Sequence, residues 1–69
     1  MKKVAVKFTS YLQLLSFIKV IDVKDWANRN CEINKADILF ISSLTEKEIE
    51  IAQSVFQAAV FNMAEQNRN

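Results

Sequence analysis

The stretch DILFISSLTEKEIE, residues 37–50, contains the two strongest structural signals in the chain. Residues 37–42 form a nearly continuous apolar run of strand length, rich in β-forming residues, which predicts a central strand covered on at least one face. Thr45 then has the position of a helix N-cap, and Glu48 completes a capping box with it. Leu44 and Ile49 flank the cap as a hydrophobic staple. The chain is therefore expected to pass directly from a strand into a helix that begins at Glu46.

This helix meets no breaker for roughly 18 residues. Its predicted apolar face is broad and consists of Ala52, Val55, Phe56, Ala59, Val60 and Met63. The small alanines on this face would allow a close approach to a sheet. The opposite stripe is polar and consists of Lys47, Glu50, Ser54 and Gln57. Phe61 lies four positions after Gln57 and therefore continues the polar stripe. We expect this ring to be covered, either by the chain's own N-terminal helix or by another molecule.

The N-terminal segment predicts a strand followed by a helix. Residues 3–8 alternate with period two, which is typical of a half-buried strand. Ser10 and Gln13 match a capping box, so a helix should begin at Tyr11 and end near Val20. The strand face expected to be buried holds Val4, Val6 and Phe8, and the other face holds Lys3, Ala5 and Lys7.

Residues 21–36 allow two interpretations. Val23 to Trp26, followed by an Asn-rich segment, can be a strand that enters a turn. Asp22 and Asp25 equally suit the first turn of a short helix. We favour strand, turn and strand, with the second strand alternating Cys31 and Ile33 against Glu32 and Asn34.

The predicted fold class is α+β, a two-layer sandwich in the order β-α-β-β-(β)-α. A mostly antiparallel sheet with both helices on one face is the simplest way to bury two amphipathic helices on a common apolar surface. Residues 1–66 should form a single small domain, and residues 67–69 a disordered C-terminal tail.

The composition excludes several kinds of site. The 69 residues include no glycine and no proline, which excludes a glycine-rich phosphate loop and leaves the turns to other residues, with Asn28, Asn30 and Asn34 as the leading candidates. The chain has no histidine, which removes the commonest general base and transition-metal ligand. Cys31 is the single cysteine, and a small core side chain explains it better than a nucleophile. We therefore predict a protein that is not an enzyme and has no metal, no cofactor and no membrane span, with a cytoplasmic location.

The first functional hypothesis is a protein-binding module: a small adaptor, inhibitor or regulator that associates with itself as a homodimer, or with a larger protein, through its C-terminal helix. Interfaces are enriched in aromatic residues, and a small domain without disulfides gains stability when a second chain covers it. The Lys, Ile and Asn content fits a bacterial or phage origin. The predicted interface residues are Phe61, Gln57, Ser54, Tyr11 and Trp26.

The alternative hypothesis is a small nucleic-acid-binding regulator that uses a basic sheet face. Residues 1–35 hold seven basic and three acidic residues, whereas the rest of the chain is acidic, so one region is suited to contact an anion. Aromatic rings among the cations would stack on bases. The predicted contact residues are Lys3, Lys7, Lys24, Arg29 and Lys35.

Overall fold

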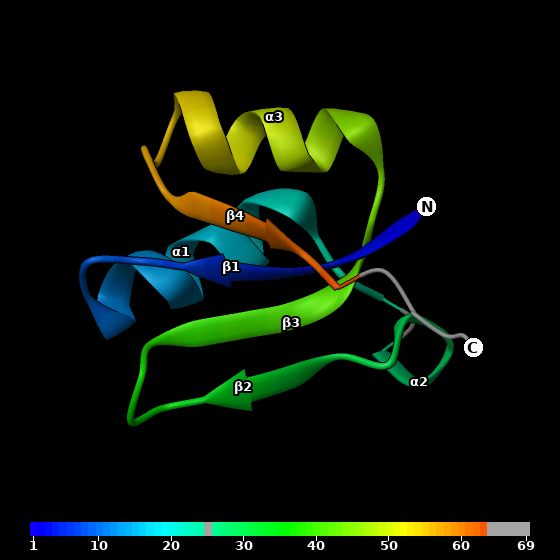
Figure 1. Ribbon diagram of the computed structural model, residues 1–69, viewed down its shortest axis with the longest axis horizontal. Coiled ribbons are helices and arrows are strands. Elements are labelled where there is room, and N and C mark those ends of the chain that lie inside the picture. Colours follow the sequence, from blue (N-terminus) through cyan, green and yellow to red (C-terminus); the bar gives the residue numbers. More distant parts are fainter. Residues whose placement is uncertain (25, 64–69) are drawn as a thin grey trace.

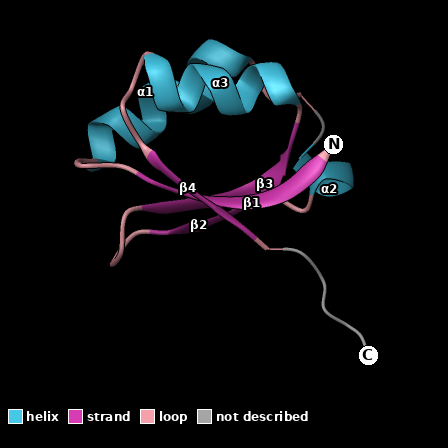
Figure 2. Ribbon diagram, turned by 45° about the horizontal axis from the view of Figure 1, so that its top comes forward, coloured by secondary structure: helices cyan, strands magenta, loops and turns pink. Residues whose placement is uncertain are grey.

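The computed structural model describes residues 1–24 and 26–63, so the predicted tail at residues 67–69 lies outside the described part of the chain. Four antiparallel strands form one sheet in the order β2-β3-β1-β4. Helices α1 and α3 lie together on one face of this sheet (Figure 2), which confirms the predicted two-layer α+β arrangement. In chain order the elements (Figure 1) are β1 (Lys2–Lys7), α1 (Tyr11–Ile21), α2 (Trp26–Arg29), β2 (Glu32–Asn34), β3 (Leu39–Leu44), α3 (Glu46–Ser54) and β4 (Ala59–Asn62).

Strand β1 occupies an interior position and has the predicted alternation. Val4 and Val6 are completely buried, while Lys3 and Lys7 are exposed. In the register with β3, Val6 lies opposite Phe40, so the inward-facing side chains of the two strands meet beneath the helices. The predicted central strand at residues 37–42 is β3, which begins and ends two residues later than expected.

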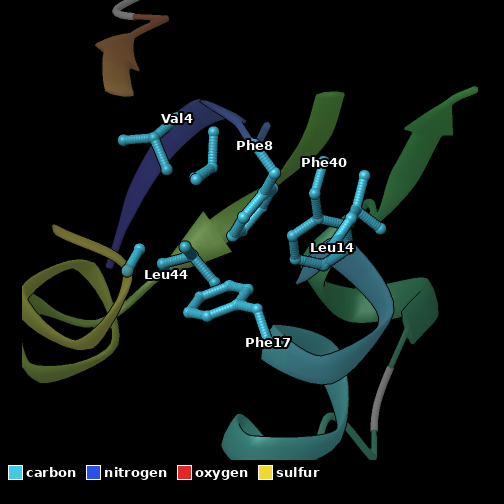
Figure 3. Close-up of a cluster of buried hydrophobic side chains, with 8 residues drawn as sticks. Val4, Phe8, Leu14, Phe17, Phe40 and Leu44 are labelled. Carbon is cyan, nitrogen blue, oxygen red and sulfur yellow. The ribbon is translucent and has the colours of Figure 1, made fainter. Parts of the chain in front are cut away.

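The core is built around Phe17, which projects from α1 onto the covered face of the sheet (Figure 3). Its ring centroid lies 5.3 Å from that of Phe8, 6.1 Å from that of Phe40 and 5.7 Å from that of Phe56. These edge-on and tilted contacts are geometries that aromatic rings favour. The Phe17 ring therefore joins α1 to β3 and to the segments that follow β1 and α3.

Helix α1 begins at Tyr11, as predicted, because Ser10 caps it. The Ser10 Oγ accepts a hydrogen bond of 3.2 Å from the Gln13 N–H. The Gln13 side chain does not complete the capping box, since its Oε1 accepts a hydrogen bond from the Thr9 hydroxyl at 2.5 Å. The helix ends at Ile21, and Asp22 follows in the left-handed conformation with a φ of 55°.

The segment between α1 and β2 differs from the interpretation that we favoured. Residues 23 and 24 belong to no strand, and residues 26–29, where the strand was expected to enter a turn, form the short helix α2; Asp25 lies outside the described residues. Trp26 packs edge-on against Phe40 at 5.9 Å, and this contact with a distant strand holds the segment in place. Asn30 makes the predicted turn with a φ of 53°, and the predicted strand follows as β2.

Helix α3 has the predicted start but not the predicted length. Thr45 and Glu48 form the complete capping box. The helix ends at Ser54, and residues 59–62 form β4 instead of two further helical turns. The Ala58 N–H donates to the Ala52 carbonyl at 3.0 Å, and Gln57 just before Ala58 has a left-handed backbone, so the chain turns away from the helix axis here. The premise that Phe61 continues a polar helical stripe is therefore wrong.

A glycine at position 57 should stabilise the protein. Gln57 has a φ of 53°, a conformation in which its Cβ is crowded. We expect Gln57→Gly to raise the free energy of unfolding by about 0.5 kcal/mol, since the relief of this crowding exceeds the added freedom of the unfolded chain. Urea denaturation followed by circular dichroism measures the change.

Gln57→Ala is the matched control, because alanine retains the Cβ and should give no gain. An equal rise in both variants would show that loss of the glutamine side chain, not backbone conformation, is responsible.

Candidate protein-binding surface

The face of the sheet opposite α1 and α3 is not covered by any helix within residues 1–24 and 26–63 (Figure 2). Strand geometry assigns side chains to this open face, because residues alternate between the two faces and the registers align neighbouring strands. Its apolar members are Ala5, Leu39, Ile41, Ala59, Phe61 and Met63. Its polar and charged members are Lys3, Lys7, Glu32, Asn34 and Ser43.

Phe61 stands at one end of a row that crosses the open face. It lies opposite Ala5 on β1, Ala5 lies opposite Ile41 on β3, and Ile41 lies opposite Glu32 on β2. Adjacent members of such a row are about 5 Å apart, so three apolar side chains lie next to one another. Phe61 remains 53% exposed and Met63 remains 42% exposed. Ala5 in the middle of the row is only 9% exposed, so the exposed apolar surface of the row lies mainly at Phe61 on the edge strand.

The other predicted interface residues do not join Phe61. Ser54 ends α3 and its hydroxyl donates to the Glu50 carbonyl, while Gln57 lies in the turn before β4. Tyr11 begins α1, and its ring lies beneath the Lys35 ammonium at 5.4 Å. Trp26 belongs to α2 at the end of the sheet. The expected surface on one C-terminal helix is therefore replaced by the open face, because β4 carries Phe61 away from α3.

The predicted basic residues are also dispersed. Lys3 and Lys7 share the open face, where each is a diagonal neighbour of Phe61. The Lys7 ammonium donates a hydrogen bond of 2.6 Å to the Asp37 carbonyl. Lys24 pairs with Asp22 at 3.3 Å in the connection after α1. Arg29, Lys35 and Lys24 lie outside the strands that form the open face, so the five cations do not make one patch.

Arg29 has a structural partner that the sequence did not reveal. Its Nη1 lies 2.9 Å from the Glu48 Oε1, and these side chains are only 17% and 14% exposed. The same carboxylate oxygen accepts the Thr45 N–H at 2.9 Å. One glutamate therefore both caps α3 and ties α2 to it.

Electrostatics at Glu48 favour the ionised form. Burial raises the pKa of Glu48, but hydrogen bonds from the Arg29 guanidinium and the Thr45 N–H, together with the Arg29 charge, outweigh this effect. The pKa of Glu48 therefore lies below its ordinary value of 4.5.

Cys31 packs against the core, and its Sγ lies 3.2 Å from the hydroxyl of the buried Ser42. Among the described residues, no group of three or more His, Cys, Asp or Glu side chains is arranged to hold a metal ion. None of the helices in the described segments combines the length and the apolar character needed to cross a membrane. Cys31 therefore contributes to packing and to one polar contact.

Comparisons with protein-family models, curated proteins and solved structures find no match to this chain.

Sequence reasoning missed Ala5, Ile41 and Met63 as neighbours of Phe61. The available signal was the adjacent pair of β-forming residues Val60 and Phe61, in a mostly apolar segment that suits a strand as much as a helix. Only the pairing of β4 with β1 decides between the two.

Loss of the Glu48 charge should reduce stability in a pH-dependent way. Because the pKa of Glu48 is lower in the folded than in the unfolded chain, its carboxylate stabilises the fold above pH 4.5 and loses this effect as the pH falls through the folded pKa. We expect Glu48→Gln to lower the free energy of unfolding by about 2 kcal/mol at neutral pH. The difference from wild type should shrink in acid, as measured by urea denaturation at both pH values.

Glu50→Gln is the control, since Glu50 is exposed on the same helix. A Glu48→Gln deficit that stays constant from neutral to acid pH would contradict the role of the charge.

Proposed function

We propose that this protein is a non-enzymatic protein-binding module and that its contact surface is the open face around Phe61. The proposed partner is a second copy of the chain. The proposal rests on the row of Ile41, Ala5 and Phe61, in which Phe61 is 53% exposed. Large exposed rings beside other apolar side chains are typical of interaction surfaces.

The size of the expected effect is modest. Covering the exposed half of a phenylalanine ring contributes about 1 kcal/mol per chain, and Met63 and Ile41 add smaller amounts. Association costs several kcal/mol in lost translational and rotational freedom. We therefore expect self-association that is weak and depends on protein concentration.

Charge supports a second copy as the occupant. The net charge of the chain is only +1, so two copies repel each other weakly. The apolar row also carries Glu32 at its far end, while Lys3 and Lys7 lie beside its middle. The open face therefore holds charges of both signs and lacks the uniform field that would oppose self-association.

The proposal includes a cytoplasmic location and a role without catalysis. Cys31 is a free thiol and the sequence offers no second cysteine for a disulfide, which suits a reducing compartment. The absence of histidine leaves few groups for proton transfer near neutral pH.

Single-stranded nucleic acid is the second candidate ligand for the same face. The specific observation in its favour is that Phe61 lies diagonally between Lys3 and Lys7, which resembles a stacking ring flanked by cations. It ranks second because Arg29 and Lys24 are paired with carboxylates elsewhere and Glu32 stands in the same row.

The test is the solution mass of the protein over a wide range of concentration, measured by sedimentation velocity. We expect the wild-type mass to rise from that of the 8.0 kDa monomer towards that of a dimer. Phe61→Thr should keep the mass near that of the monomer, because threonine suits a strand but removes the ring.

Leu12→Gln is the matched control. Leu12 is 75% exposed on α1, so this variant removes a large apolar side chain from the other side of the molecule and should associate as wild type does. Circular dichroism verifies that both variants fold. A wild-type protein that stays monomeric at every concentration overturns the proposal, and monomers that bind labelled single-stranded DNA at low salt through Phe61 favour the second candidate.

A further inference from the structure

Strand β4 is an edge strand whose outer side has no described neighbour. Among the described residues it pairs with β1 alone. The Met63 N–H donates to the Lys3 carbonyl at 2.9 Å, and in an antiparallel ladder every second residue repeats this direction. Ala59, Phe61 and Met63 therefore direct their backbone groups to β1, whereas the N–H and C=O groups of Val60 and Asn62 point away from the sheet.

The hydrogen bonds of β1 on its other side give the same result independently. The Phe8 N–H donates to the Ile38 carbonyl at 3.1 Å, so the even-numbered residues of β1 bond to β3. The backbone groups of its odd-numbered residues therefore point towards β4, in agreement with the hydrogen bond from the Met63 N–H to the Lys3 carbonyl. The outward direction of the Val60 and Asn62 backbone groups follows from both strands.

The two edges of the sheet are protected to different degrees. The opposite edge strand, β2, has three residues, begins with Glu32 and is followed by Lys35. Residues 59–63 contain no charged residue and no proline. Short strands, charges and prolines are the usual devices against edge-to-edge pairing. The β4 edge is also short, at four residues, but it has neither charges nor proline and is therefore the edge more open to an added strand.

We propose that β4 pairs antiparallel with β4 of a second copy, with the two-fold axis at Phe61 and perpendicular to the sheet. This proposal rests on the proposed function and specifies how the two copies meet. Val60 of each copy lies opposite Asn62 of the other, so all the outward backbone groups of these two residues are paired. A register shifted towards the N-terminus would place Ala58 in the ladder, and the Ala58 N–H is already bonded to Ala52.

The side chains suit this register. The two Phe61 residues face each other as a pair without direct backbone hydrogen bonds, the kind in which Cα atoms approach to about 4.5 Å. Both rings lie on the open face, where a cross-strand aromatic pair is favourable. Ala59 lies opposite Met63 of the second copy. Residues 59–63 are uncharged, so the pairing brings no like charges together across the two-fold axis, and this favours an identical chain as the partner.

The test is disulfide crosslinking between single-cysteine variants. Ala59→Cys and Met63→Cys are made separately in a Cys31→Ser background, in which serine keeps a polar contact to Ser42. In the proposed register, position 59 of one copy lies opposite position 63 of the other, within reach of a disulfide. Identical positions lie about 13 Å apart along the strands, beyond that reach.

We expect mild oxidation of the two variants mixed together to yield a crosslinked dimer at least tenfold faster than oxidation of either variant alone. Asn62→Pro, introduced into both variants, should abolish the crosslink, because it removes an outward N–H while leaving the bond from Met63 to Lys3. Proline is tolerated on an edge strand in such a position. Asn62→Ala keeps the N–H and should crosslink normally.

The outcomes separate this proposal from the proposed function. If sedimentation shows a dimer that depends on Phe61 but the mixture crosslinks no faster than the single variants, edge pairing is wrong and association through the open face stands. If Asn62→Pro folds and the mixture still crosslinks, edge pairing is also wrong. A wild-type protein that is monomeric throughout and a mixture without crosslinks overturn both.

Discussion

Strand β1 is hydrogen-bonded on both of its edges, and the rest of the structure depends on this two-sided pairing. Its even-numbered residues bond to β3 and its odd-numbered residues to β4. The same alternation directs Val4 and Val6 into the core and Lys3 and Lys7 to the open face. One six-residue strand therefore fixes the centre of the sheet, the floor of the core and the middle of the candidate surface.

The absence of glycine shapes the connections between the elements. Within residues 1–24 and 26–63, four non-glycine residues adopt a left-handed backbone: Asp22, Asn30, Ile38 and Gln57. Each such residue costs about 1 kcal/mol, a substantial amount for a chain of this size. The interlocked aromatic core, centred on Phe17, offsets these costs by burying rings from several elements at once.

The candidate surface arises because two short helices cover one face of the sheet, and none of the described helices lies on the other face. On that face the side chains are not uniformly polar, and the apolar row runs up to the unprotected edge at β4. An apolar face and an open backbone edge thus meet at Phe61. The two features on which the proposed association rests therefore lie in one strand of four residues.

Elements with strong local signals were predictable from the sequence. The alternation of β1, the serine cap of α1 and the capping box of α3 depend on residues that are close in the chain. These features can therefore be predicted without knowledge of the tertiary structure. The fold class followed from their order, since amphipathic helices need a shared apolar face. Phe61 was identified as a ring on an otherwise polar surface that another helix or molecule should cover, although it was assigned to the wrong element.

The tertiary structure alone decided α2, β4 and therefore the position of Phe61. Helix α2 is held by contacts of Trp26 with Phe40 and of Arg29 with Glu48, residues far away in the chain. Residues 58–62 fit a helix or a strand equally well by pattern. Continuing the helix would have left the odd-numbered backbone groups of β1 without the partners that β4 supplies. The sequence by itself determined where the apolar and capping residues lie. Whether the C-terminal segment forms a helix or a strand was decided by the tertiary structure, because the backbone groups of the distant strand β1 need hydrogen-bond partners.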